Sequence, residues 1–155
     1  AQMLYAGSQE QYTALFAQPI AESAISAAVV AIRPQLHFAS PQDLAKLAGA
    51  AAGAWPLMPQ LRAGVLQPLV WDLEQAVRFR HRELNAQDLV LTAVAFVKLN
   101  ALDAITCSIL GGQIAERISE CSHKDLSLLL WACGRQCWVQ QHCSIAATEE
   151  VHRRQ

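Results

Sequence analysis

Three stretches of the chain repeat one pattern of polar and apolar positions. Each opens with Ser or Asn, has Asp three positions later, and continues with Leu and further apolar residues. The stretches are "ASPQDLAKLAGAAAGAW" at 39–55, "LNAQDLVLTAVAFVKLN" at 84–100 and "CSHKDLSLLLWACGRQC" at 121–137. A Ser or Asn side chain caps free N–H groups in a first helical turn, and a nearby carboxylate favours the positive end of the helix dipole. The pattern therefore predicts helix starts at Ser40, Asn85 and Ser122.

The residues after each cap are apolar almost all round, which predicts helices buried on several sides. More amphipathic segments follow at 57–84 and 102–119. We expect Pro59 and Pro68 to break or bend the first of these and Gly111-Gly112 to weaken the second. The last segment, from Val139 onward, is polar, and we expect it to fray. Upstream, residues 10–17 and 21–32 predict two further helices.

An apolar helix followed by an amphipathic one therefore recurs along the chain. The shared aspartates, Asp43, Asp88 and Asp125, lie 45 and 37 residues apart. A single hairpin cannot bury its apolar faces alone, whereas stacked hairpins form a continuous core. The sequence predicts an all-α fold, an α-solenoid of tandem helical hairpins with a period of about 37 residues. The whole chain, 1–155, forms one helical-repeat domain in this interpretation, with N-terminal helices in 1–38 and units at 39–84, 85–121 and 122–155.

Composition narrows the possible functions. The chain is 53% hydrophobic and 16% charged, enough to bury a sizeable core, and no apolar run is long enough to predict a membrane span. Its net charge is −1, with 12 Lys and Arg against 13 Asp and Glu. Proteins that grip nucleic acid along a long groove are usually basic, so any such contact here must be local. The chain begins at Ala1, which suits either a processed product or a fragment of a longer protein.

The three stretches resemble the first helix of octotricopeptide and heptatricopeptide repeats. The best matches are Gln87-Asp88-Leu89 with Lys98-Leu99, and Asp125-Leu126 with Leu130-Trp131-Ala132. The first copy departs from the pattern, with Gly49 where Trp is common, and the third has Lys124 in place of Gln. The resemblance covers about residues 39–155. It implies RNA-binding in an organelle, the mitochondrion or alternatively the plastid, plausibly as a component of a mitochondrial ribosome. The RAP domain often associated with this group contributes no residues here.

Five basic residues are candidate contacts for RNA phosphates. Arg78, Arg80 and Arg82 form the densest basic run, while Lys98 and Arg135 each lie ten positions past a shared Asp, where the first copy has Gly53. Each has an alternative interpretation: a solvated helix end for the run, and favourable interaction with the helix dipole for the other two. The residues "HRRQ" at 152–155 form a second small patch, expected to be a mobile tail.

Trp55, Trp71, Trp131 and Trp138 are able to stack on unpaired bases. Packing in the core or between repeats is the favoured interpretation, most strongly for Trp131, which lies in a run of leucines.

Motifs for catalysis are absent from the sequence: it has no phosphate loop, no dinucleotide fingerprint, no zinc-protease helix and no nucleophile elbow. We therefore expect a non-enzymatic protein without cofactor or metal, since His142, Cys143 and Cys137 match no standard zinc spacing. Cys133 and Cys143 are ten positions apart, but five cysteines argue against a complete disulfide framework, and we expect free thiols.

A protein-interaction scaffold within a large organellar complex is the alternative function. The two functions predict different surfaces: a basic stripe favours RNA, and an exposed apolar patch favours protein.

Overall fold

The computed structural model describes residues 19–135 and 141–154, and within those ranges the chain is helical with no strand. The α-helices are α2 (Pro19–Ile32), α3 (Pro41–Leu57), α4 (Gln67–Arg80), α5 (Ala86–Leu99), α6 (Ala104–Glu116), α7 (His123–Arg135) and α8 (Gln141–Arg153). The all-α prediction is confirmed. The helix expected at 10–17 lies outside the described residues.

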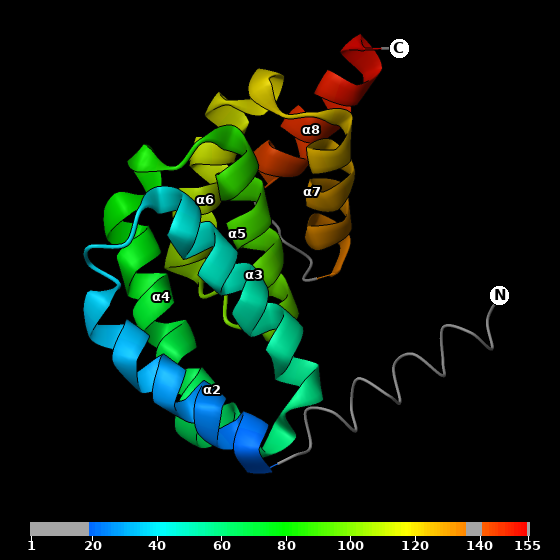
Figure 1. Cartoon of the computed structure of the whole chain (residues 1–155). Coiled ribbons are helices and arrows are strands. Elements are labelled where there is room, and N and C mark those ends of the chain that lie inside the picture. The colour runs from blue at the N-terminus through cyan, green and yellow to red at the C-terminus, as the bar shows by residue number, and fades with distance from the viewer. Residues whose placement is uncertain (1–18, 136–140, 155) are drawn as a thin grey trace, which may run out of the picture.

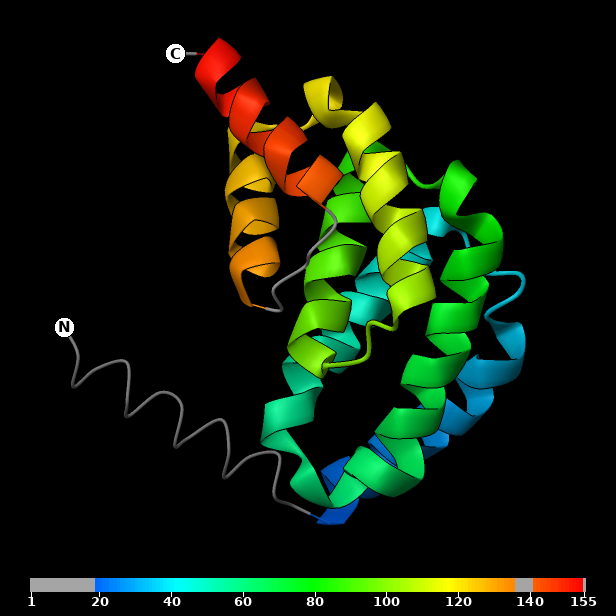
Figure 2. The same ribbon diagram turned by 180° about the vertical axis from the view of Figure 1, so that it is seen from behind.

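The helices α3 to α8 form two layers. In the first layer α5 packs between α3 and α7, and in the second α6 packs between α4 and α8 (Figures 1 and 2). Each helix of the first layer also contacts the helix that follows it in the chain, so that α3 pairs with α4, α5 with α6 and α7 with α8. The helix α2 precedes these pairs and contacts the segment between α3 and α4.

All three predicted helix starts are confirmed, because each cap residue accepts a hydrogen bond from the Asp three positions later. The Asp43 N–H donates to Ser40 Oγ over 3.1 Å, the Asp88 N–H to Asn85 Oδ1 over 2.8 Å, and the Asp125 N–H to Ser122 Oγ over 3.2 Å. At the third cap the Ser122 N–H also donates to the Asp125 carboxylate over 3.0 Å, which completes a reciprocal capping box.

The helix α5 lies at the centre of the hydrophobic core. Leu89, Val90, Ala93 and Phe96 are fully buried, and the exposed positions of α5 are Gln87, Leu91 and Lys98. Those three lie on one narrow stripe, because helical residues four and seven positions apart share a face. Since α3 and α7 flank α5 and the second layer lies behind it, this stripe faces solvent on the free side of the first layer.

The predicted break in 57–84 is confirmed. Pro59–Leu61 forms a 3₁₀ turn and Arg62–Leu66 a π turn, and α4 begins only at Gln67. Pro68 falls in the first turn of α4, where its missing N–H costs nothing. The glycine pair does not interrupt α6, which runs from Ala104 to Glu116.

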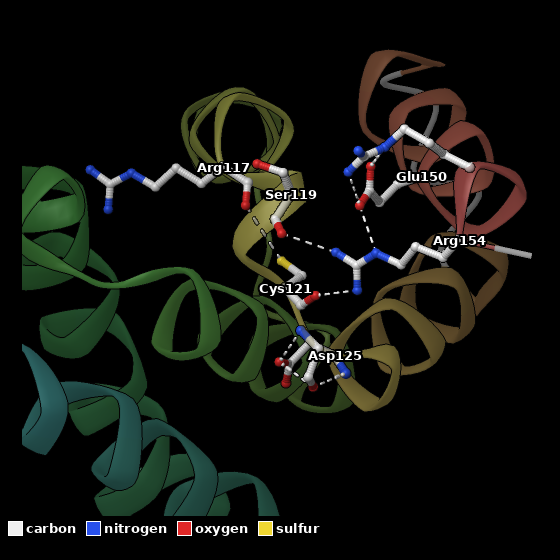
Figure 3. A network of polar contacts seen from close by, with 8 residues as sticks. Arg117, Ser119, Cys121, Asp125, Glu150 and Arg154 are labelled. Atoms are coloured by element: carbon white, nitrogen blue, oxygen red, sulfur yellow. Dashed lines mark hydrogen bonds and ion pairs between the residues drawn. The ribbon is translucent and has the colours of Figure 1, made fainter.

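Two predictions about the C-terminal end are wrong. The segment expected to fray forms α8, and the patch at 152–155 is not a mobile tail where it is described. Arg153 and Arg154 both bind the buried Glu150 carboxylate, at 2.6 Å each. Arg154 also donates to the carbonyl groups of Cys121 at 2.7 Å and Ser119 at 3.0 Å, which ties α8 to the segment before α7 (Figure 3).

This contact recurs in each pair of helices, and we call it the arginine clamp. Arg80, Arg117 and Arg154 each donate to the carbonyl of the residue just before a helix cap, namely Ala39, Leu84 and Cys121. Arg117 and Arg154 also bind a second carbonyl two residues earlier, that of Arg82 and Ser119 respectively. The three arginines are spaced evenly, with 37 residues from each to the next. Each clamp therefore joins the end of a second-layer helix to the start of its own first-layer partner.

Candidate nucleic-acid interface

A hollow lies between α5 and α7 on the free side of the first layer. Its volume is about 710 Å³, and it is lined by Val97, Lys98, Asn100, Leu130, Trp131, Gly134 and Arg135. Lys98 and Arg135 are exposed, and the Trp131 side chain is 43% exposed. The hollow is therefore an open surface site with cationic and aromatic groups.

Two cations converge on the Trp131 ring from different helices. Lys98 Nζ, from α5, and Arg135 Cζ, from α7, each lie 5.8 Å from the ring centroid. The π-face of an indole attracts cations, by about 0.5–1 kcal/mol at exposed sites. Trp131 therefore holds two positive charges beside each other, and we call these three residues the Trp131 site.

Two of the residues that the sequence offers as phosphate contacts lie together here, and their contact with RNA stays a prediction. Lys98 and Arg135 were selected because they occupy equivalent repeat positions, and the structure brings them together at one ring. For Trp131 the sequence favours packing in the core or between repeats. The residue is 43% exposed, so it is not in the core, but its ring lies against Lys98 of the neighbouring helix α5. The buried face of α7 is formed by Leu126, Leu129 and Ala132, and Trp131 lies outside this helical spacing. The spacing of four between Trp131 and Arg135 was the available signal, because such pairs are neighbours on a helix surface.

A second hollow of about 420 Å³ lies between α3 and α5, and Lys98 lines this one as well. Gly49 and Gly53 open its α3 wall, and a Cβ atom at either position would meet no atom within 4 Å. Gly53 is the first-copy counterpart of Lys98 and Arg135. The structure therefore places the three equivalent positions along one surface that crosses α3, α5 and α7, with basic residues at two of them.

The other predicted phosphate contacts lie elsewhere. Arg78 is largely buried: its Nε donates to Thr106 Oγ1 over 2.6 Å, and its guanidinium pairs with Glu74 and Asp103. Arg80 pairs with Glu83 at 2.6 Å and forms the first arginine clamp. The hydrogen bond from Arg80 lowers the pKa of the Glu83 carboxyl. Both guanidinium groups therefore already have anionic or carbonyl partners.

Arg82 is the member of the predicted basic run that remains available. It is exposed, and no other described residue forms an ion pair or hydrogen bond with its side chain. It precedes the start of α5, whereas Lys98 is near the end of that helix. An α-helix rises about 1.5 Å per residue, so the two are separated by roughly 20 Å. The five predicted residues therefore do not form one site.

An exposed apolar patch lies on α2 and α4, whereas the Trp131 site lies on α5 and α7. Val30, Trp71 and Phe79 are 70%, 61% and 83% exposed. They line a hollow of about 660 Å³ beside the ion pair between Arg33 Nε and Asp72, whose atoms are 2.6 Å apart. We call Val30, Trp71 and Phe79 the α4 patch. Such a patch, with its neighbouring charges already paired, suits an apolar protein surface.

Cys107, Cys121, Cys133 and Cys143 are free thiols, as expected, and Cys137 lies outside the described residues. The Cys143 thiol hydrogen-bonds to Cys133, which lowers the pKa of Cys133 and raises that of Cys143. Within residues 19–135 and 141–154, no group of three or more His, Cys, Asp or Glu side chains is placed to hold a metal ion. Across the same part of the chain, no helix combines the length and apolar character needed to cross a bilayer.

No protein-family model matches the chain, nor does any curated protein or solved structure.

Proposed function

We propose that the chain is a non-catalytic helical-repeat protein that binds RNA through the Trp131 site. The single observation that carries this proposal is the convergence of Lys98 and Arg135 on one exposed indole ring. The two cations come from different helices, so the fold itself, and not a local run of basic residues, creates the positive site. Phosphate groups of the RNA backbone would bind these cations.

The charge balance of the whole chain agrees with a small, local contact. A net charge of −1 gives little general attraction for a polyanion, and Arg78 and Arg80 are engaged internally. Two phosphate contacts give modest affinity on their own. The protein would therefore act as one RNA-contacting part of a larger ribonucleoprotein assembly.

The repeat interpretation supports an organellar assignment. The confirmed caps and the even 37-residue spacing of the arginine clamps agree with a solenoid of about that period. A unit of this length and its first-helix pattern resemble heptatricopeptide repeats, which implies the mitochondrion, or alternatively the plastid. We propose a structural role in a mitochondrial ribosome as the most specific form of this function.

Charge reversal tests the proposal directly. The variant Lys98→Glu with Arg135→Glu should weaken binding to a single-stranded RNA oligonucleotide by roughly tenfold or more at moderate salt, because two phosphate contacts are lost. Fluorescence anisotropy in a salt titration measures this, and the slope of log affinity against log salt should fall by about 1.4.

Lys124→Glu is the control, because it reverses one charge on an exposed residue at the other end of α7, as each half of the double variant does at the Trp131 site. An equal loss of affinity in this control and in the double variant would contradict a localised site. Arg82→Glu tests the other available predicted contact. A loss confined to Arg82→Glu would move the RNA contact away from the Trp131 site.

A protein scaffold without direct RNA contact is the second candidate, and the α4 patch is the observation that favours it. Large exposed apolar side chains gathered around one hollow are typical of protein interfaces. Crosslinking with mass spectrometry should recover protein partners from the native complex. Their loss on Trp71→Ala with Phe79→Ala, without any RNA crosslink at α5 or α7, would favour this second function over the first.

A further inference from the structure

We propose that Trp131 is a stacking platform for one unpaired base, so that the Trp131 site binds single-stranded RNA and rejects duplex. This inference rests on the proposed function and specifies the form of RNA that the site takes. It follows from the exposure of the ring, the volume beside it and the flexible side chain that carries one of its two cations.

The indole ring of Trp131 is open to solvent. An indole that serves only to fill space is covered by neighbours, as Leu126 and Leu129 are on the same helix. Trp131 is instead 43% exposed and borders a hollow of about 710 Å³. This volume lies in the range of small-molecule binding sites. The hollow therefore has room for a base against the indole.

The two cations over the Trp131 ring are held there differently. Arg135 is four positions from Trp131 on the same helix, whereas Lys98 reaches the ring from α5 on a flexible four-carbon chain. A cation–π contact at an exposed site is weaker than the stacking of a base on an aromatic side chain. An incoming base would displace the Lys98 ammonium, which is then free to pair with a phosphate of the same strand. Arg135 remains beside the ring as a second phosphate contact.

The same site excludes duplex RNA. Bases within a duplex are paired and stacked on each other, and the deep major groove of A-form RNA does not admit side chains to them. A base must therefore be unpaired to reach Trp131. Stacking uses the π-face that all bases share, so the site should tolerate any base.

The experiment compares a 12-nucleotide single strand with the same sequence in duplex, using the full chain. Wild-type protein should bind the single strand at least tenfold more tightly and show quenching of tryptophan fluorescence. Trp131→Leu should lose roughly tenfold in affinity for the single strand and leave duplex binding unchanged, whereas Trp131→Phe should retain most of the affinity but lose the quenching. Circular dichroism establishes that each variant is folded.

Trp71→Leu is the matched control, because it removes another exposed tryptophan from the second layer. It should leave affinity unchanged. Equal binding of single strand and duplex, or full affinity in Trp131→Leu while charge reversal of Lys98 and Arg135 still weakens binding, would overturn the stacking inference and leave the proposed function in place. Absence of binding to both RNAs would contradict the proposed function itself.

Discussion

At the scale of single residues, the basic side chains of this protein differ most in what they contact. Arg78 binds Glu74, Asp103 and Thr106, and the Thr106 hydroxyl in turn donates to Glu74 over 2.8 Å. Lys98 and Arg135 instead lie against an aromatic ring, which leaves their charges available to an anion. Residues of one charge thus hold the fold together in one part of the molecule and lie exposed beside an aromatic ring in another.

Glu150 makes stability depend on pH. Hydrogen bonds from Arg153 and then Arg154 lower its pKa from 4.5 to about 2. A carboxyl group whose pKa is lower in the folded state stabilises the fold fully above its unfolded pKa, and this contribution is lost as the pH falls through the folded pKa. Glu150→Gln should therefore lower the thermal midpoint at neutral pH, and the difference from wild type should shrink between about pH 4.5 and 2. A difference that stays constant over this range would contradict the ion-pair account.

The thiols should differ in reactivity. Cys133 and Cys107 are both half-buried, but a hydrogen bond from Cys143 lowers the pKa of Cys133, whereas burial and then Asp103 raise that of Cys107. The thiolate is the reactive form, so Cys133 should be alkylated by iodoacetamide at a lower pH than Cys107. Peptide mass spectrometry across a pH series measures the order. Cys143→Ser is the control, since it changes the thiol that hydrogen-bonds to Cys133. Faster alkylation of Cys107 than of Cys133 would contradict the predicted order of reactivity.

The repeat register of the sequence groups residues that the structure places on one surface, and their contact with RNA stays a prediction. Lys98 and Arg135 were selected by their equal distance from the shared aspartates. The exposure of Trp131 could not be predicted, because a run of leucines shows that a helix is apolar but not which of its positions face inward. The partners of Arg78, such as Asp103 in the next unit, depend on how the layers meet, which no local pattern encodes.

At the scale of elements, local chemistry determines where helices start, and tertiary contacts determine whether they persist. The caps at Ser40, Asn85 and Ser122 were readable because the interacting groups lie three positions apart. The helix α8 was not readable, because its end is held by the carbonyl of Cys121, which is 33 residues away. A polar helix with such an anchor does not need a strong apolar stripe.

The cap of the central helix gives an element-scale prediction. Asn85→Ala removes the acceptor for the Asp88 N–H and should lower the free energy of unfolding by about 1 kcal/mol. Chemical denaturation measures this change. Asn85→Ser is the control, because a serine hydroxyl accepts the same hydrogen bond, and it should retain most of the stability. Equal losses in the two variants would mean that the side-chain cap is not the cause.

At the scale of the whole molecule, two surfaces with different chemistry lie on different layers. The Trp131 site, on the first layer, is cationic and aromatic, while the α4 patch, on α2 and the second layer, is apolar with its neighbouring charges paired. Because they lie on separate layers, occupation of one surface would leave the other accessible. Their separation also allows substitutions at one surface without disturbing the other.

Each arginine clamp should limit the local opening of the pair of helices that it joins. Arg117→Ala removes hydrogen bonds to the carbonyl groups of Leu84, at 2.5 Å, and Arg82, at 3.2 Å. Charged hydrogen bonds of this kind contribute about 1.5–3 kcal/mol each when buried, and less where solvent reaches them. Hydrogen exchange should increase at the start of α5 and the end of α6, while the start of α3 stays protected as the internal reference. A uniform increase in hydrogen exchange along the chain would contradict a clamp that stabilises only α5 and α6.

The arginine clamps are evenly spaced, with 37 residues from each arginine to the next. Each arginine binds a carbonyl group within its own pair of helices. The arginine clamp is therefore encoded in the same stretch of sequence as the helices that it joins. The stretch from 85 to 121 contains a cap, two helices and the arginine that binds the carbonyl just ahead of it. A second copy of that stretch inserted after residue 121 would contain its own arginine clamp. It would also present α7 with the same packing surface. In that sense the chain could be lengthened by inserting further copies of residues 85–121.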